Sequence, residues 1–245
     1  MKIIGIIPAR FGSTRFPGKP LAMIHGKSMI QRVVEQAQKA SSLYYLMVAT
    51  DDQRIYDHVK EFGGNVVMTH ADHPSGTDRC LQAFEKTCFG ADAVINIQGD
   101  EPFVSPLQID ALAELIAKPE VEIATLVKRI HDAETLFDPN RVKVVFDNQG
   151  KALYFSRHAI PYQKNQPQEN WLLHHHYFKH IGIYAYKSKI LQDISEIHPT
   201  TLEMAESLEQ LRWLQCGKSI YVAQTDIETP TVDTPEDLEK LLSGL

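Results

Sequence analysis

The feature that most constrains this chain of 245 residues is the regular alternation of strand-like and helix-like segments in its first half. Short apolar, β-branched runs are each followed by a segment in which apolar residues recur every three or four positions. Strands that alternate with helices pair in parallel, because each helix carries the chain back across the sheet. The sequence therefore predicts an α/β/α sandwich, a mostly parallel mixed sheet with helices on both faces.

The predicted strands of this half are Lys2–Pro8, Tyr44–Thr50, Asn65–Thr69 and Ala93–Gln98, and the predicted helices follow Ser28 or span Gln53–Phe62, Thr77–Cys88 and Ser105–Ala117. After Val121–Lys128 the rhythm breaks. The second half predicts a hairpin of Val142–Asp147 and Ala152–Phe155, a loop at Tyr162–Asn170, a strand at Ile181–Tyr186, and helices at Ser188–Ser195, Glu203–Gln215 and after Thr234. No linker divides the chain, so we expect a single domain, 1–245, with a small antiparallel subregion at about 130–190.

Charge is distributed unevenly along the chain. The formal net charge is −6, which argues against a general nucleic-acid binder. Positions 1–34 contain six basic residues and no acidic one, whereas the remaining 211 residues contain 19 basic and 31 acidic ones. A basic end on an acidic protein indicates a local anion site, the alternative being a solvated basic surface.

Cysteine content and hydropathy indicate the compartment. The three cysteines are odd in number and show no Cys-x-x-Cys spacing, so neither a disulfide framework nor a zinc site is predicted. No apolar run approaches the roughly 20 residues of a membrane span, and Lys2–Pro8 is typical of a strand rather than of an amphipathic transit helix. We expect a cytoplasmic protein without a membrane partner.

The segment Pro8–Pro20 (PARFGSTRFPGKP) leaves the carboxyl end of the first predicted strand, where open α/β sheets bind ligands. Its glycines let the backbone approach a ligand closely, its hydroxyls accept and donate hydrogen bonds, and its bases supply positive charge. It matches neither a Walker A loop nor a G-x-G-x-x-G fingerprint. It predicts a phosphate cradle built from Gly12, Ser13, Thr14, Gly18, Arg10, Arg15 and Lys19, or else an exposed loop with incidental bases.

Two acidic residues are candidate metal ligands. Asp100 follows the strand Ala93–Gln98 and would face the same crevice, and Mg²⁺ takes one or two protein carboxylates beside phosphate oxygens and water. Asp233 precedes a predicted helix and would supply the second carboxylate. Each has an ordinary alternative: a turn residue for Asp100 and a charge that complements the helix dipole for Asp233.

Two further segments carry polar side chains. His73–Arg79 (HPSGTDR) offers hydroxyls, amides and a guanidinium at a helix start, its alternative being an ordinary N-cap. His174–His176 invites a metal assignment, but three consecutive side chains diverge and cannot all face one point. The aromatic residues of Trp171–Tyr186 fit a core or a subunit interface better than a metal site.

Together these segments resemble the 3-deoxy-manno-octulosonate cytidylyltransferase family, in which CMP-Kdo synthetases belong. The resemblance spans nearly the whole chain and is carried, in order, by IPARFGSTRFPGKPL (Ile7–Leu21), HPSGTDR (His73–Arg79), NIQGDEP (Asn96–Pro102), ALYFSR (Ala152–Arg157), KHIGIYAY (Lys179–Tyr186), LEQLR (Leu208–Arg212) and VDTPEDL (Val232–Leu238). One departure is Phe16, where relatives commonly have Leu.

The resemblance implies a nucleotide-diphospho-sugar transferase fold, a homodimer, a requirement for Mg²⁺, and transfer of CMP from CTP to 3-deoxy-D-manno-octulosonate (Kdo) for lipopolysaccharide assembly. It also implies that the subregion at about 130–190 serves sugar binding and dimerisation. It implies catalytic roles for Arg10, Lys19, Asp100 and Asp233, the two aspartates as metal ligands. The nucleotide would be bound by Pro8, Ala9, Arg10, Gly12, Ser13, Arg15, Lys19, His73, Ser75, Gly76 and Arg79, and the sugar by Gln98, Arg157, His180, Tyr184, Glu209 and Gln210.

Alternatives remain open at this point. An enzyme that activates 8-amino-Kdo or sialic acid would need only a few different pocket contacts. A Mg²⁺-dependent glycosyltransferase would require a D-x-D motif, whereas Asp100 is followed by Glu-Pro. A nucleotide sensor without catalysis would bind CTP and release no pyrophosphate, and the paired acids argue against it.

Overall fold

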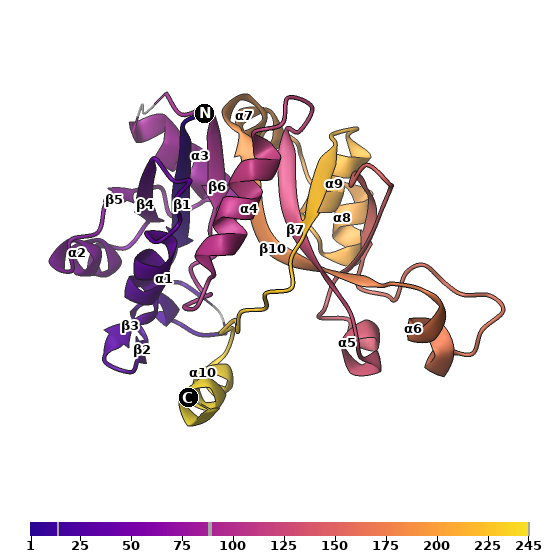
Figure 1. Ribbon diagram of the computed structural model, residues 1–245. Coiled ribbons are helices and arrows are strands. Elements are labelled where there is room, and N and C mark those ends of the chain that lie inside the picture. Colours follow the sequence, from indigo (N-terminus) through magenta and orange to yellow (C-terminus); the bar gives the residue numbers. More distant parts are fainter. Residues whose placement is uncertain (14, 88–89, 245) are drawn as a thin grey trace.

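The computed structural model describes residues 1–13, 15–87 and 90–244 (Figure 1). Its strands are β1 Ile3–Ala9, β2 Met23–Ile24, β3 Lys27–Ser28, β4 Tyr45–Thr50, β5 Val66–Met68, β6 Ala93–Asn96, β7 Ile123–Arg129, β8 Lys143–Phe146, β9 Ala152–Ser156, β10 Phe178–Lys187 and β11 Ile220–Gln224. Its α-helices are α1 Met29–Ala37, α2 Gln53–Glu61, α3 Gly76–Thr87, α4 Pro106–Ile116, α5 Ala133–Phe137, α6 Trp171–His174, α7 Ser188–Ser195, α8 Thr201–Glu206, α9 Gln210–Gln215 and α10 Pro235–Gly244, with 3-10 turns η1 Lys19–Leu21 and η2 Gln168–Asn170.

The main sheet is mixed and mostly parallel, as predicted. Its path runs β11-β7-β10-β6-β1-β4-β5, with β8 paired to β10 and β9 paired to β8. Strand β1 pairs in parallel with β4 on one side and β6 on the other, and β10 is antiparallel to both β6 and β7. From β1 the chain proceeds first to the β4 side and later to the β6 side. The carboxyl ends of β1 and β6 therefore flank a topological switch point, where such sheets bind ligands.

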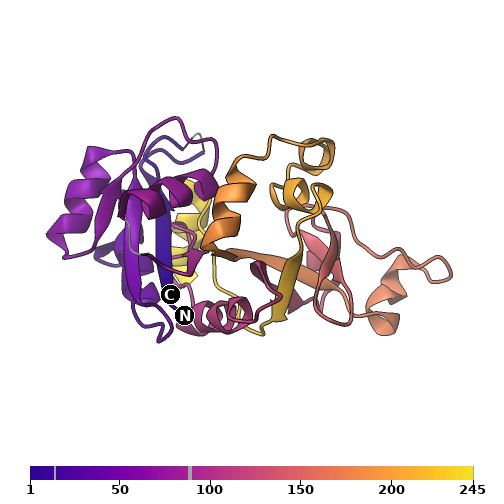
Figure 2. The same ribbon diagram turned by 90° about the horizontal axis from the view of Figure 1, so that it is seen from above.

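Helices cover both faces of this sheet, which gives three layers (Figure 2). In β1, Ile3 and Ile7 point into one core with α1, α2 and α4, whereas Ile4 and Ile6 point into the other with α3, α7 and α9. A strand buried on both faces must be apolar at every position, which explains the unbroken hydrophobic run near the N-terminus.

The antiparallel addition predicted at 130–190 is present as β8 and β9 beside β10. The chain turns between β8 and β9 at Gly150, whose φ of 79° lies in the left-handed region. Beyond this hairpin, α5, η2 and α6 extend away from the sheet (Figure 1) around a small apolar cluster that includes Trp171 and Tyr177. These two aromatic residues are core residues.

The structure corrects two predicted segments. The helix predicted at Glu203–Gln215 is two helices, α8 and α9, because Ser207 adopts a left-handed φ of 53° and ends α8. The loop predicted at Tyr162–Asn170 ends in the turn η2. The short hairpin β2–β3 and the edge strand β11 were not predicted, and the Cys88 end of the predicted third helix lies outside the described residues.

The structure also bears on the cysteines and on membrane spans. Cys80 and Cys216 are free thiols, and burial raises the pKa of Cys80 well above its usual range. Within the described ranges, no helix is long and apolar enough to cross a bilayer.

Candidate active site

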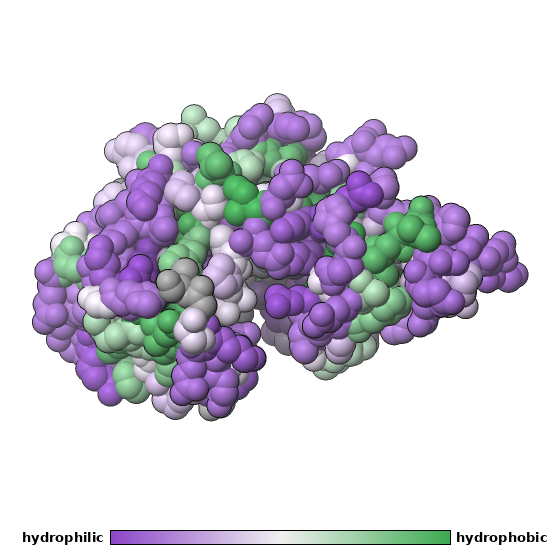
Figure 3. Space-filling model, turned by 60° about the horizontal axis from the view of Figure 1, so that its bottom comes forward, coloured by the Kyte–Doolittle hydropathy of each residue, from purple (hydrophilic) through white to green (hydrophobic). Residues whose placement is uncertain are grey.

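A cavity of about 250 Å³ opens where the carboxyl ends of β1 and β6 meet. Figure 3 shows the hollowed, largely hydrophilic face that carries it. All four segments that the sequence singled out contribute to its lining: Pro8, Ala9, Arg10, Ser13, Arg15, Lys19, His73, Ser75, Gly76, Arg79, Gln98, Asp100 and Asp233. The four segments therefore converge on one cavity, as predicted, and their roles toward a nucleotide and a metal ion stay predictions.

The loop after β1 is folded back on itself before η1 begins. The amides of Ser13 and Gly18 both donate to the carbonyl of Phe11, and Gly18 has a left-handed φ of 72°. A side chain at Gly18 would be strained by this φ and would also meet the Phe11 ring at 3.1 Å. The tight loop places Lys19 at the start of η1, pointing into the cavity. Gly12 is absent from the cavity lining, and Thr14 lies outside the described residues.

The two candidate metal ligands meet at one cation. Lys19 Nζ lies 2.7 Å from Asp100 Oδ2 and 3.5 Å from Asp233 Oδ1, and Arg15 Nη2 lies 3.3 Å from the same Asp233 oxygen. Residues 100 and 233 are held together by the backbone as well, since the amide of Val232 donates to the Asp100 carbonyl at 3.1 Å. The sheet thus brings two carboxylates far apart in sequence to the same point.

This geometry fits a magnesium site. Two carboxylates that converge on an ammonium group show that the position attracts a cation, and both offer the hard oxygen ligands that Mg²⁺ takes. The described residues contain no group of three or more His, Cys, Asp or Glu side chains around one point. Asp100 and Asp233 would therefore hold the ion together with substrate oxygens and water.

The segment His73–Arg79 caps a helix and also contributes polar side chains to the cavity wall. Ser75 Oγ accepts from the amide of Asp78 at 3.1 Å, so Ser75 is the N-cap of α3 and at the same time lines the cavity. Arg79 is buried, and its guanidinium donates to Asp51 Oδ2 at 2.9 Å and to Thr69 Oγ1 at 2.6 Å. It ties the ends of β4 and β5 to the cavity wall.

The close approach of two strand ends explains the glycine in NIQGDEP. A Cβ on Gly99 would lie 2.8 Å from the carbonyl oxygen of Pro8, a distance that real Cβ atoms essentially never show. Only glycine lets the loops after β1 and β6 come this close. Beside it, Gln98 Nε2 donates to the carbonyl of Gly182 at 2.9 Å, which connects the cavity to β10.

Five of the six predicted sugar-binding residues lie outside this lining. Arg157 donates to the carbonyls of Pro139, Glu206 and Ser207. His180 and Tyr184 lie side by side, with ring centroids 5.2 Å apart, and desolvation lowers the pKa of His180 to about 3. Their roles toward a sugar stay predictions, as do those of Glu209 and Gln210.

Glu209 is nevertheless connected to the cavity wall. It accepts from Thr77 Oγ1 at 3.1 Å, at the start of the helix that Ser75 caps, and burial raises the pKa of its carboxyl. Next to it, Gln210 is buried. The hydroxyl of Tyr184 is also buried, and no hydrogen-bond partner for it lies among the described residues.

Sequence reasoning missed two acidic residues beside the cavity. Glu101 is 6% exposed and accepts from Thr229 Oγ1 at 3.2 Å; burial, reinforced by the charge of Asp100, raises its pKa to about 7. It also lines a second cavity of about 230 Å³, together with Lys179 and Glu228. Asp51 orients Arg79. Asp51 directly follows the predicted strand Tyr44–Thr50, and Glu101 directly follows Asp100. These positions at the same sheet edge are the signal by which the sequence could have identified them.

The fold and the cavity define a class: an α/β nucleotidyltransferase-type protein with a basic loop and paired acids at the switch point of its sheet. The cytidylyltransferase family model matches residues 4–227. A 3-deoxy-manno-octulosonate cytidylyltransferase of Cytophaga hutchinsonii is 54% identical over 239 residues, 97% of this chain and 95% of that protein. Its counterpart of Parabacteroides distasonis is 51% identical over 249 residues, covering 100% and 98%.

Solved structures agree with these relatives. A CMP:2-keto-3-deoxy-manno-octonic acid synthetase complexed with CTP aligns with a TM-score of 0.91 and 43% identity, over 99% of this chain and 98% of that one. A Bacillus anthracis putative glucose-1-phosphate thymidylyltransferase, at 20% identity and a TM-score of 0.65, shares the fold. The chain belongs to the 3-deoxy-manno-octulosonate cytidylyltransferase family, as its motifs indicated.

Proposed function

We propose that this protein transfers CMP from CTP to the anomeric hydroxyl of Kdo, giving CMP-Kdo and pyrophosphate. The observation that carries the proposal is the match, along 99% of the chain, to a synthetase of this type solved with CTP. The basic and acidic side chains that line the cavity support it, since they would bind a triphosphate and its metal ion.

The reaction is an in-line attack of the sugar hydroxyl on the α-phosphorus, which requires positioning and charge neutralisation rather than covalent help. Arg10 and Arg15 would bind the triphosphate, and Lys19 would stabilise the negative charge that develops on pyrophosphate. Ser75 and the start of α3 would hold the nucleoside end. The close approach of Gly99 to the carbonyl of Pro8 keeps the loops after β1 and β6 next to each other.

Asp100 and Asp233 would hold Mg²⁺, which lowers the pKa of the attacking hydroxyl and neutralises phosphate charge when bound. In the structure their shared cation is Lys19. If these carboxylates held a divalent cation, the ammonium group of Lys19 would no longer be needed to neutralise them and would be free to contact the phosphates. Lys19 would thus pair with the two carboxylates before the substrate binds and with the phosphates afterwards.

The setting of the reaction is part of the proposal. Tyr162 and Leu173, which are 71% and 78% exposed on the segment that extends from the sheet, support a homodimer formed through this region. Sedimentation velocity of the wild type would show whether the mass is that of two chains.

CMP-Kdo is an activated sugar, so a glycosyl transfer such as lipopolysaccharide assembly would consume it. Cytoplasmic location stays a prediction.

The proposed function is tested by a pyrophosphate-release assay that crosses CTP, UTP, ATP and GTP with Kdo, 8-amino-Kdo and sialic acid in Mg²⁺. We expect release with CTP and Kdo only, and we expect chelation of the metal to stop it. Faster release with 8-amino-Kdo or sialic acid would reassign the sugar. Tight CTP binding with no release in any combination would replace the enzyme by a sensor.

A further inference from the structure

The C-terminal helix α10 lies below the sheet and is reached by a segment without regular structure, residues 225–233 (Figure 1). Asp233 is the last residue of this segment and lies two residues before the first residue of α10. The matched family region ends at residue 227, so Asp233 and α10 lie beyond it. Besides the bond from the Val232 amide to the Asp100 carbonyl, contacts of the segment and of the helix position this carboxylate.

The first device is the cap of α10. Asp237 Oδ2 accepts from the amides of Asp233 and Thr234 at 3.1 and 3.0 Å, and Thr234 Oγ1 accepts from the amide of Asp237 at 3.2 Å. This reciprocal pair of bonds is a capping box with an aspartate at its third position. It fixes the backbone of Asp233 relative to the helix axis.

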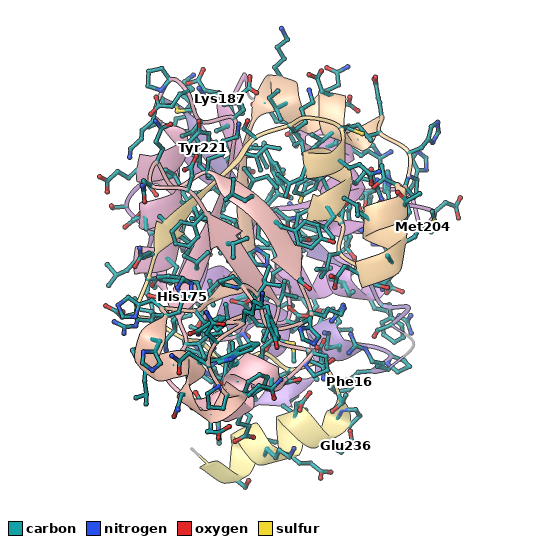
Figure 4. All side chains as sticks on the ribbon, turned by 90° about the vertical axis from the view of Figure 1, so that its right-hand side faces the viewer. Phe16, His175, Lys187, Met204, Tyr221 and Glu236 are labelled. Carbon is teal, nitrogen blue, oxygen red and sulfur yellow. The ribbon has the colours of Figure 1, made fainter. Side chains whose placement is uncertain are left out.

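The second device is apolar. Val232 is fully buried with Ile24 and Met29, and Phe16, Leu238 and Leu241 pack against the same cluster. Figure 4 shows Phe16 beside α10, on which Glu236 is labelled. Phe16 follows Arg15 in the loop after β1, so the helix and that loop share one set of apolar contacts.

We propose that α10 is a positioning element for the metal site. Its docking on Phe16 sets Asp233 opposite Asp100, and binding of the metal–nucleotide complex in turn holds the helix in its docked position. This inference rests on the proposed Mg²⁺–CTP site. The coupling is reciprocal by thermodynamic linkage: if docking strengthens binding, then binding must stabilise docking to the same extent.

The chain offers a matched pair of variants for the test. Leu241 packs on the cluster, whereas Leu242, the next residue of the same helix, is 38% exposed. Leu241→Ala should raise the Kd of Mn²⁺–CTP about fivefold or more, with a parallel rise in the Mg²⁺ concentration for half-maximal rate and an unchanged KM for Kdo. Leu242→Ala should match the wild type. Asp237→Ala removes the oxygen that accepts both amides at the cap and leaves the apolar contacts in place, so it should repeat the effect of Leu241→Ala.

The second measurement is amide hydrogen exchange across residues 233–244, with and without Mn²⁺–CTP. We expect binding to slow exchange in the wild type and in Leu242→Ala, and to slow it less in Leu241→Ala. Equal affinities and equal protection in both leucine variants would overturn the inference while leaving the proposed function intact. Absence of metal-dependent CTP binding in the wild type would instead contradict the proposed function.

Discussion

The nucleotide side and the expected sugar side of this protein are built differently. On the nucleotide side, loops that leave parallel strands β1 and β6 bring separate motifs into one cavity. On the sugar side, all candidates except Gln98 come from the antiparallel strand β10, the end of the hairpin and the start of α9. Their side chains pack in a core, bond to backbone carbonyls or line a second cavity. Parallel strands end at a common edge, whereas residues of an antiparallel strand alternate between faces. The first arrangement is therefore easier to infer from sequence.

The largest effect is expected at the carboxylate that anchors the nucleotide side. Asp100→Asn removes a charge but little volume, and we expect turnover to fall about 10³-fold, since several kcal/mol of charge stabilisation would be lost. Pyrophosphate release would measure it, and thermal unfolding would verify the fold. Asp226→Asn, an exposed aspartate of the segment that leads to α10, is the matched control. Near wild-type turnover of Asp100→Asn would remove the metal role.

Lys19→Ala tests whether the basic N-terminal segment is a site or a surface. Lys19 contacts both carboxylates, whereas Lys27 pairs with Glu35 on the exposed surface. We expect kcat/KM for CTP to fall about 10²-fold in Lys19→Ala and to be unchanged in Lys27→Ala. Equal effects of the two substitutions would mean that the segment acts through overall charge and contains no defined triphosphate site.

Much of this contrast was already present in the sequence. The apolar runs of β1, β4 and β6 identified the parallel core, and position at the end of β1 identified Lys19 as a site residue. The break between α8 and α9 had no glycine to mark it, because Ser207 adopts the left-handed conformation instead. The short strands of β2–β3 are stabilised by tertiary contacts rather than by an amphipathic pattern of their own.

Glu101 lies between the two regions, and its pKa of about 7 makes stability depend on pH. Between about pH 4.5 and 7 the folded state keeps a proton that the unfolded state has released, so the free energy of unfolding falls as pH rises. We expect this group to contribute a loss of about 2–3 kcal/mol across that window. Glu101→Gln lacks this titrating carboxyl, so its free energy of unfolding lacks this contribution to the pH dependence.

Urea unfolding at a series of pH values would compare the two chains. The stability of Glu101→Gln relative to the wild type should increase from pH 4.5 to 7 and then level off. A difference that is independent of pH would show that folding does not change the pKa of Glu101, and that the boundary between the cavities is more hydrated than the structure indicates.

A smaller effect is expected on the sugar side. The Arg157 guanidinium is engaged with three backbone carbonyls, so Arg157→Ala should lower the free energy of unfolding by about 1–2 kcal/mol through loss of those bonds. Arg141→Ala, at an exposed arginine of the same region, is the control. If KM for Kdo rises strongly while stability is unchanged, then Arg157 contacts the sugar carboxylate, and the sugar site extends to the hairpin.

The most direct test of the account is a double-mutant cycle on Mn²⁺–CTP affinity, using Asp100→Asn, Asp233→Asn and both together, with CTP binding in the absence of metal as the reference. If the two carboxylates hold one ion, each single change should weaken metal-dependent binding, and the double change should weaken it by much less than the product of the two. Independent effects that multiply, or single changes without effect, would contradict a shared metal site at this edge of the sheet.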